Sequence, residues 1–356
     1  PPPPPPPPRP APAPPPPALP APPPPAPGAS PPHHTQRDYS GDTESWAVFG
    51  QATWNINDSN RLTLGARYTA EEKTAYREMN IYDTNTGQLD ILQAATGSAV
   101  FGVDYANLGE ATGGLFPVHR LNEKRDEDFF TPTAIYEWDA TEETMLYGSV
   151  STGAKAGGFD ARGNRAGDFE YGDETVTAYE LGAKSRLLDE RLELNAAIFY
   201  SEYEDLQVSQ FDGTLGFVVG NAAQATTQGV EFDGRWLLTQ GLTWSFAAAY
   251  LDFEFDDYED GTCSSRVKQA TGQTLCDYSG ERNIFTPEWT ASTSLDYVMG
   301  LTDTLDIHAT LDVLYSDDHY VDVTLNPDVQ QDAYTKLNAR LALEADNWSL
   351  ALVGKN

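Results

Sequence analysis

Residues 174–203 read ETVTAYELGAKSRLLDERLELNAAIFYSEY and hold two runs in which apolar and polar side chains alternate with period two. In the first run Tyr179, Leu181 and Ala183 alternate with polar neighbours, and the second run, 192–200, follows the same rule. Such alternation indicates β-strands with one apolar and one polar face. The short join between the runs predicts an antiparallel hairpin.

The same period extends from Ser45 to the end of the chain and predicts an all-β, antiparallel fold. About twelve strands are expected, near residues 45–56, 60–73, 127–138, 144–153, 173–187, 191–206, 226–238, 242–256, 282–299, 303–316, 331–345 and 347–355.

Short and long joins alternate strictly between these strands. The short joins are Asn57–Ser59, Asp139–Glu143, Leu188–Glu190, Thr239–Gly241, Gly300–Thr302 and Asp346. The long joins lie near residues 74–126, 154–172, 207–225, 257–281 and 317–330. All short turns therefore fall at one end of the array, which is typical of an outer-membrane barrel and which a soluble sandwich has no reason to maintain.

The composition agrees with a membrane barrel. The chain has 356 residues, a net charge of −32 and a mean hydropathy of −0.47, and no apolar run approaches the roughly 18 residues of a transmembrane helix. The strong negative charge excludes nucleic acid as a partner. Acidic loops can instead be solvated, or bridged by divalent cations to lipopolysaccharide phosphates.

The two faces of the predicted strands have separate roles. The apolar face is expected to contact lipid and the polar face to line a wide interior that is wet or filled by a polar plug. Charged residues expected on the inner face are Arg67, Lys184, Glu193, Glu231, Arg235 and Arg340. Four tryptophans near short turns fit either an aromatic belt at the membrane interface or ordinary strand packing: Trp54, Trp138, Trp244 and Trp348.

The beginning of the chain differs in composition, since residues 1–32 contain 22 of the 26 prolines. We expect residues 1–40 to form a Pro-rich disordered segment that is not native barrel sequence, or alternatively a polyproline rod, and residues 41–356 to form a partial barrel. Residue 1 is Pro, and no charged start precedes an apolar run. No signal peptide is recognised, so the chain is expected to start downstream of the natural beginning.

The two cysteines, Cys263 and Cys276, fall within one predicted loop. A disulfide that closes this loop would fit an oxidising compartment, and two free thiols are the alternative. The spacing has no nearby His or Cys to complete a metal site. No catalytic set, cofactor site or metal site is expected, and the acidic pairs Asp256–Asp257 and Asp317–Asp318 are read as solvated rather than Ca²⁺-binding.

Several segments together resemble the barrel of TonB-dependent outer-membrane receptors, over about residues 45–356. They are Leu62–Lys73 (LTLGARYTAEEK), Tyr147–Gly163 (YGSVSTGAKAGGFDARG), Glu174–Tyr203, Val218–Gly234 (VVGNAAQATTQGVEFDG) and the terminal NWSLALVGKN. The resemblance implies the C-terminal, incomplete portion of a siderophore-receptor-like protein in the outer membrane of a Gram-negative bacterium.

In such receptors a plug fills a 22-stranded barrel, and TonB drives uptake of a ferric siderophore, cobalamin or another scarce nutrient. This chain departs from the pattern because it shows no plug, no TonB box, about twelve of the 22 strands and no terminal aromatic strand. The alternatives are a passive porin-like channel with a loop folded inward, an adhesin barrel, or a non-functional gene fragment.

A loop following Tyr147–Thr152 carries the strongest candidates for ligand contact. Lys155, Phe159, Arg162 and Arg165 bring three cations and an aromatic ring into an acidic chain. Such groups suit an anionic or catecholate ligand through charge and cation–π contact, and the alternative is loop charges with no ligand role. His319 and Tyr320, in a later loop, are weaker candidates of the same kind.

Overall fold

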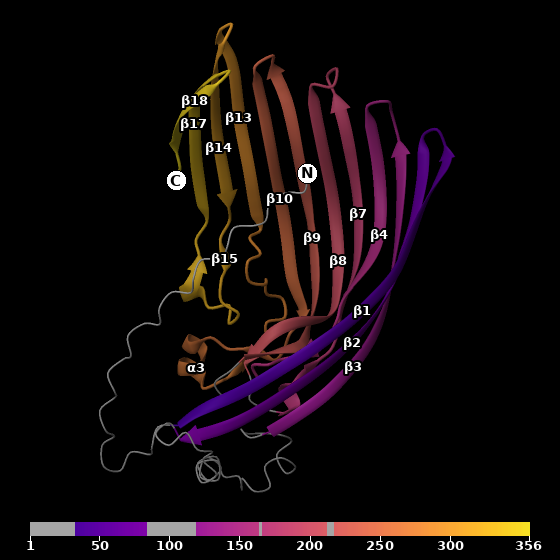
Figure 1. The fold of residues 1–356 in the computed structure, drawn as a ribbon, viewed down its shortest axis with the longest axis vertical. Helices are drawn as coiled ribbons and strands as arrows, with labels where there is room; N and C mark the ends of the chain where they lie inside the picture. The colour runs from indigo at the N-terminus through magenta and orange to yellow at the C-terminus, as the bar shows by residue number, and fades with distance from the viewer. Residues whose placement is uncertain (1–32, 84–118, 164–165, 212–216) are drawn as a thin grey trace, which may run out of the picture.

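The computed structural model describes residues 33–83, 119–163, 166–211 and 217–356. Twelve long strands form one antiparallel sheet in which each strand pairs with its neighbours in chain order (Figure 1). They are β1 (His33–Asn57), β2 (Asn60–Asp83), β3 (His119–Asp139), β4 (Thr144–Lys155), β7 (Glu174–Leu187), β8 (Leu192–Phe211), β9 (Phe217–Thr239), β10 (Leu242–Asp257), β13 (Trp289–Thr302), β14 (Leu305–Ser316), β17 (Tyr334–Ala345) and β18 (Trp348–Gly354).

The remaining elements lie in the long connections at one end of the sheet, as Figure 1 shows for α3 and β15. They are β5 (Gly158–Phe159), η2 (Ala166–Asp168), β6 (Glu170–Tyr171), β11 (Gly261–Thr262), α3 (Ser265–Thr271), β12 (Leu275–Cys276), β15 (His319–Tyr320), η3 (Pro327–Val329) and β16 (Gln330–Gln331). The opposite end holds the short turns. The predicted strand set and the asymmetry of its connections are both confirmed.

The first hairpin is longer than the sequence pattern predicted. β1 begins at His33 and pairs with β2 from His33↔Asp83 down to Asn57↔Asn60. Residues 33–40 therefore belong to a strand, which corrects their assignment to the Pro-rich segment; residues 1–32 lie outside the described residues. The extension was missed because these residues are mostly polar and show no alternation, whereas pairing between backbones does not require it.

The connection between β8 and β9 is shorter than expected. Most of the predicted loop 207–225 is strand, since β8 runs to Phe211 and β9 starts at Phe217. The register of this pair shifts between Tyr203 and Leu206, where the strand bulges. Such a bulge interrupts the alternation of apolar and polar residues, so the sequence pattern predicted a loop where the structure has strand.

The pairing of residues across neighbouring strands shows which side chains share a face of the sheet. Val48 pairs with Tyr68 and Trp54 with Leu62, so all four side chains lie on one face of the sheet, where Val48, Tyr68 and Trp54 form part of an exposed apolar surface. Aromatic residues on this face form one row beside the short turns and a second row about eight residues farther along. The first row contains Trp54, Trp138, Trp236, Trp244 and Trp348, and the second contains Trp46, Tyr68, Phe130, Tyr179, Tyr200, Tyr250 and Trp289.

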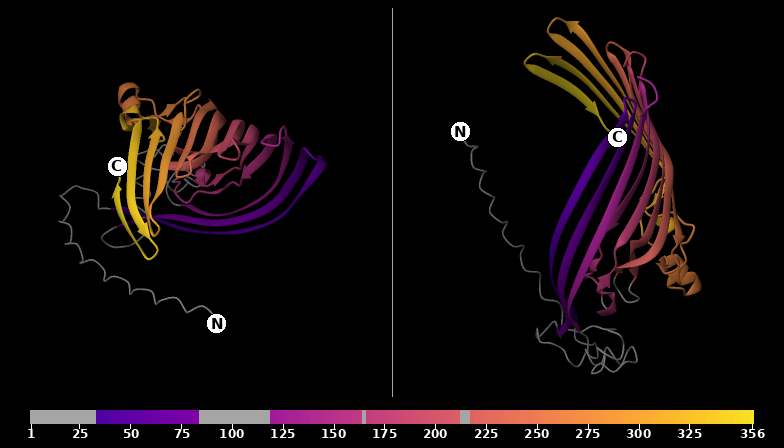
Figure 2. Two further views of the ribbon diagram at one scale, coloured as in Figure 1. Left: turned by 90° about the horizontal axis from the view of Figure 1, so that it is seen from above. Right: turned by 90° about the vertical axis from the view of Figure 1, so that its right-hand side faces the viewer.

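Eight strand residues cover roughly 26 Å along the strand, which at the usual tilt of about 40° corresponds to about 20 Å along the membrane normal. Both rows therefore fit within the apolar band of about 25 Å that an outer-membrane barrel presents to lipid. The charged residues predicted for the inner face all alternate with this apolar set and so lie on the opposite face of the sheet. The sheet is strongly curved, as Figure 2 shows. β1 and β18 are the two edges of this sheet among the described strands, so the barrel is open. No helix in the described ranges has the length and apolar character needed to span a bilayer.

Candidate ligand-facing site at the long-loop end

The connection between β4 and β7, residues 156–173, crosses the concave face of the sheet. On one side Arg77 of β2 donates from Nη1 to the carbonyl oxygen of Asp160 at 2.7 Å. On the other side the Val219 N–H of β9 donates to the carboxylate of Asp160 at 2.8 Å. Because β3, β4, β7 and β8 lie between β2 and β9, a loop that contacts both must extend across the inner face of these six strands.

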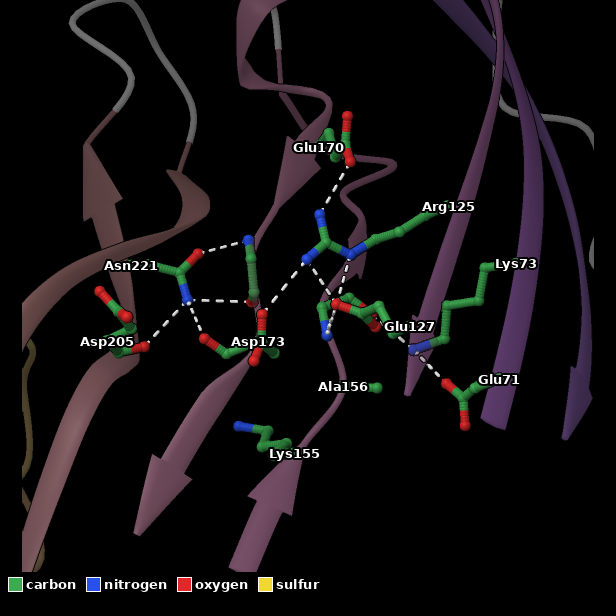
Figure 3. Close-up of polar contacts among 12 residues, drawn as sticks. Glu71, Lys73, Arg125, Glu127, Lys155, Ala156, Glu170, Asp173, Asp205 and Asn221 are labelled. Atoms are coloured by element: carbon green, nitrogen blue, oxygen red, sulfur yellow. Dashed lines mark hydrogen bonds and ion pairs between the residues drawn. The ribbon is translucent and has the colours of Figure 1, made fainter. Parts of the chain in front are cut away.

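Arg125 of β3 is the ionic centre of this attachment (Figure 3). Its guanidinium donates to Glu127 at 2.5 Å and to Glu170 of the loop at 2.8 Å, and lies 3.4 Å from Asp173. Glu127 in turn accepts from the Gly157 N–H at 3.3 Å. One half-buried arginine thus connects the barrel wall to both ends of the loop.

Lys73 of β2 adds a second cation to the same attachment. Its Nζ donates to the Gly157 carbonyl oxygen at 2.5 Å and lies 2.6 Å from Glu71 (Figure 3). Together with Gln207 and Asn221, described below, Lys73 and Arg125 form what we call the loop lock. These four wall residues hold the backbone and the acidic side chains of residues 156–173.

A small apolar cluster lies beneath the loop. Phe159 and Phe169 pack with ring centroids 5.0 Å apart, and both are buried with Ala75 of β2. The guanidinium of Arg77, which is fully buried, lies 4.6 Å from the centre of the Phe169 ring. Phe159 is therefore part of the packing that seats the loop, and its ring is withdrawn from the surface.

The predicted cations take different positions. Lys155 is 62% exposed on the inner face, with Nζ 3.7 Å from Glu174, and Arg162 is 57% exposed. Arg162 donates from its side chain and its backbone to Asp160, at 2.8 and 2.7 Å. Arg165 lies outside the described residues.

Asp160 is the buried counter-ion of this loop. Burial alone would raise the pKa of Asp160, but hydrogen bonds from the Arg162 side chain, the Arg162 N–H and the Val219 N–H outweigh it and hold the pKa below its usual range. The carboxylate is thus charged at neutral pH and holds Arg162, whose guanidinium still faces solvent.

His319 and Tyr320 lie in a separate cluster formed by the connections after β10 and β14. Arg282 forms an ion pair with Asp318, and its guanidinium lies 5.2 Å from the centre of the Tyr320 ring. His319 packs near Phe285, with ring centroids 6.1 Å apart. The structure does not bring these two candidates together with Lys155 and Arg162 in any contact among the described residues.

The same end of the sheet also holds an aromatic core under the connection 258–288. Phe255, Tyr258 and Tyr278 are buried together with Leu325, and Cys263 is joined to Cys276 in a disulfide. The Tyr278 hydroxyl lies 2.7 Å from the carbonyl oxygens of Thr262 and Thr324, so it links two connections. Burial raises the pKa of both tyrosines to about 12.

Sequence reasoning missed the residues that hold the β4–β7 loop: Lys73, Arg77, Arg125, Gln207 and Asn221. Their partners are far away in the chain, and no local pattern reveals such contacts. A signal was nevertheless present, because Gly157 and Asn221 lie within two of the segments that carried the family resemblance. No grouping of three or more His, Cys, Asp or Glu side chains suited to a metal ion occurs in the described ranges.

Known proteins show the same barrel. The family profile "TonB dependent receptor-like, beta-barrel" matches residues 9–356. A pesticin receptor of Yersinia enterocolitica is 26% identical over 161 residues, covering 45% of this chain and 21% of the relative. A probable TonB-dependent siderophore receptor, PiuA, of Acinetobacter baumannii is 27% identical over 206 residues, covering 56% of this chain and 26% of the relative.

Among solved structures, the ferric yersiniabactin uptake receptor FyuA of Yersinia pestis superposes with a TM-score of 0.68 at 19% identity. The superposition covers 90% of this chain and 42% of that receptor, so the chain spans less than half of it. At this identity the likeness establishes the fold. Together with the profile match over nearly the whole sequence, it shows that the chain belongs to the TonB-dependent receptor family and forms part of its β-barrel in the outer membrane of Gram-negative bacteria.

Proposed function

We propose that this barrel belongs to a receptor that takes up a ferric siderophore or a similar scarce nutrient, driven by TonB through a plug domain. The family match over residues 9–356 carries the proposal, because the family is one of transport receptors rather than enzymes. The name of the relative PiuA, a probable siderophore receptor, supports an iron complex as the ligand. The apolar face would contact outer-membrane lipid, and lipopolysaccharide would surround the outer rim.

Lys155 and Arg162 are the groups we propose for ligand contact, since both are exposed cations at the long-loop end of an acidic chain. The ammonium group of Lys155 and the guanidinium group of Arg162 suit an anionic iron complex. His319 and Tyr320 provide a second proposed contact, and the buried Phe159 would act by supporting the loop. Arg165 is proposed as a further ligand contact on the basis of its position in the sequence alone.

Uptake of radiolabelled iron from a panel of ferric siderophores tests the proposal. A Gram-negative strain lacking its own receptors would express the full gene, with and without functional TonB. We expect uptake that requires TonB, and a several-fold weaker affinity in Lys155→Ala and Arg162→Ala. Arg266→Ala is the matched control, because Arg266 is an exposed loop cation paired with Asp328 in another connection. TonB-independent uptake would overturn the proposal.

A passive channel is the second candidate, because the β4–β7 loop folds across the interior as a constricting loop would. This function predicts flux that rises linearly with solute concentration and is insensitive to dissipation of the proton-motive force. Liposome swelling with uncharged sugars measures it directly.

A further inference from the structure

Asn221 of β9 makes an unusual contact with the end of the β4–β7 loop. Its Oδ1 accepts from the Gly172 N–H at 2.5 Å, and its Nδ2 lies 2.9 Å from the Gly172 carbonyl oxygen. The same Nδ2 lies 3.0 and 2.9 Å from the carbonyl oxygens of Asp173 and Asp205 (Figure 3). One side-chain amide thus binds both backbone groups of Gly172, as a neighbouring strand would.

Gln207 of β8 holds the other end of the loop at the same place. Its Nε2 lies 3.1 Å from the Ala156 carbonyl oxygen and 3.0 Å from that of Gly172, and its backbone N–H donates to Glu174 at 2.8 Å. The first and last parts of the loop are therefore drawn together against β8 and β9. From β2 and β3, on the other side of the loop, Lys73 binds Gly157 and Arg125 binds Glu170 and Asp173.

The two ends approach each other so closely that glycine is required. A Cβ on Gly157 would lie 2.4 Å from the Tyr171 carbonyl oxygen and 2.7 Å from Nε of Arg125. Such contacts are far below van der Waals separation. Glycine at position 157 is consequently required for the two ends of the loop to meet, in addition to the four residues of the loop lock.

We propose that Asn221 is a positioning residue that pins the described parts of this connection, residues 156–163 and 166–173, over the inner wall as a fixed shelf. The shelf covers the inner wall at Ala75 and holds Lys155 and Arg162 at its rim. The inference does not depend on what the barrel transports, because it concerns the position of the loop and not its ligand. The shelf is thus a static part of the lumen rather than a moving lid.

Thiol labelling at Ala75 tests the shelf in the full chain, purified in detergent. Ala75 is 3% exposed and packs beneath the loop against Phe159 and Phe169, so Ala75→Cys carries a thiol that the shelf protects. The two natural cysteines are bonded to each other and do not react. The rate of maleimide labelling at position 75 then reports how often the shelf lifts.

Asn221→Ala removes every side-chain bond of the amide and is expected to raise the labelling rate at least tenfold, since several hydrogen bonds to backbone are lost together. Asn221→Asp retains only the acceptor for the Gly172 N–H and should label at a rate close to that of Asn221→Ala. Asn195→Ala is the matched control, because Asn195 is an inner-wall amide that donates to Asp233 of the neighbouring strand and contacts no part of the loop.

A second thiol, Ala342→Cys, separates lifting of the shelf from unfolding of the sheet, because Ala342 is buried on β17 far along the sheet from β9. Labelling at 75 that rises while labelling at 342 stays slow supports the proposal. Equal labelling at 75 in Asn221→Ala and Asn195→Ala overturns it, as does fast labelling at 75 with Asn221 intact. Parallel acceleration at 75 and 342 also overturns it, because Asn221 would then stabilise the sheet and not the loop.

Discussion

Two connections at the same end of the sheet are held in opposite ways. Residues 156–173 are tied to the barrel wall mainly by charged and amide side chains, among them Arg125 and Asn221. Residues 258–288 are held by a buried aromatic core around Phe255 and by a disulfide within the connection itself. The first attachment consists of polar contacts with strands on both sides of the loop. The second consists of apolar packing, which includes Leu325 of the neighbouring connection, and of a covalent bond.

The two kinds of attachment should respond differently to mutation, reduction and pH. Burial of aromatic rings and a covalent bond are insensitive to pH near neutrality, and removal of either should be costly. Hydrogen bonds and partly exposed ion pairs contribute less individually and depend on protonation. Four changes, given in order of decreasing effect, test whether the two connections are independent.

Truncation of Phe255 should have the largest effect. Phe255 is 2% exposed and packs on Phe253 and Tyr258 with ring centroids 5.1 and 4.9 Å apart. Phe255→Ala should cost roughly 3–5 kcal/mol of local stability, because a large cavity forms. Hydrogen exchange should accelerate in 258–288 and stay unchanged in 156–173. The control is Phe49→Ala, since Phe49 is 75% exposed.

Reduction of the disulfide should have the next largest effect. Cys263 and Cys276 are 13 residues apart, and closure of a loop of about this size stabilises by about 3 kcal/mol in the chain-entropy description. Dithiothreitol should therefore raise hydrogen exchange within 263–276. Exchange in 156–173 is expected to stay constant, and a parallel change there would show that the two connections are coupled.

A methyl group at Gly157 should loosen the polar attachment. Gly157→Ala places a Cβ 2.4 Å from the Tyr171 carbonyl oxygen, and the resulting backbone shift should cost roughly 1–3 kcal/mol. Labelling of Ala75→Cys measures the displacement, and 258–288 should keep its exchange protection. Gly50→Ala is the control, because a Cβ at Gly50 has no atom within 4 Å. Equal labelling in the two variants would contradict the close approach.

Acid should have the smallest effect, and only on the polar connection. The pKa of Asp160 is below its usual value of about 3.8, so its contribution is complete above that value and is lost as the pH falls through the lower, folded-state pKa. Exchange at Arg162 and Val219, corrected for intrinsic rates, should therefore stay constant from pH 7 to 5 and increase only below about pH 3.8. In Asp160→Asn this acid step should disappear.

The strands were predictable because their signal is local. Alternation in 174–203 placed β7 and β8 within a residue or two except at the far end of β8, where a bulge interrupts the period. The candidate site was less predictable. Lys155 and Arg162 are exposed cations as expected, but Phe159 is packed under the loop, and its partner Ala75 lies more than 80 residues earlier.

The class of fold, the lipid and inner faces of the strands, and the end at which the long connections gather all follow from the amino-acid sequence. Side-chain period and turn length are properties of neighbouring residues and need no knowledge of the partner strand. The three-dimensional structure was needed to show that β1 extends back to His33, that the connection between β4 and β7 covers the inner face, and that Asn221 and Arg125 hold it there. Those features depend on backbone pairing and on contacts between strands that curvature brings together, and no short-range pattern encodes them.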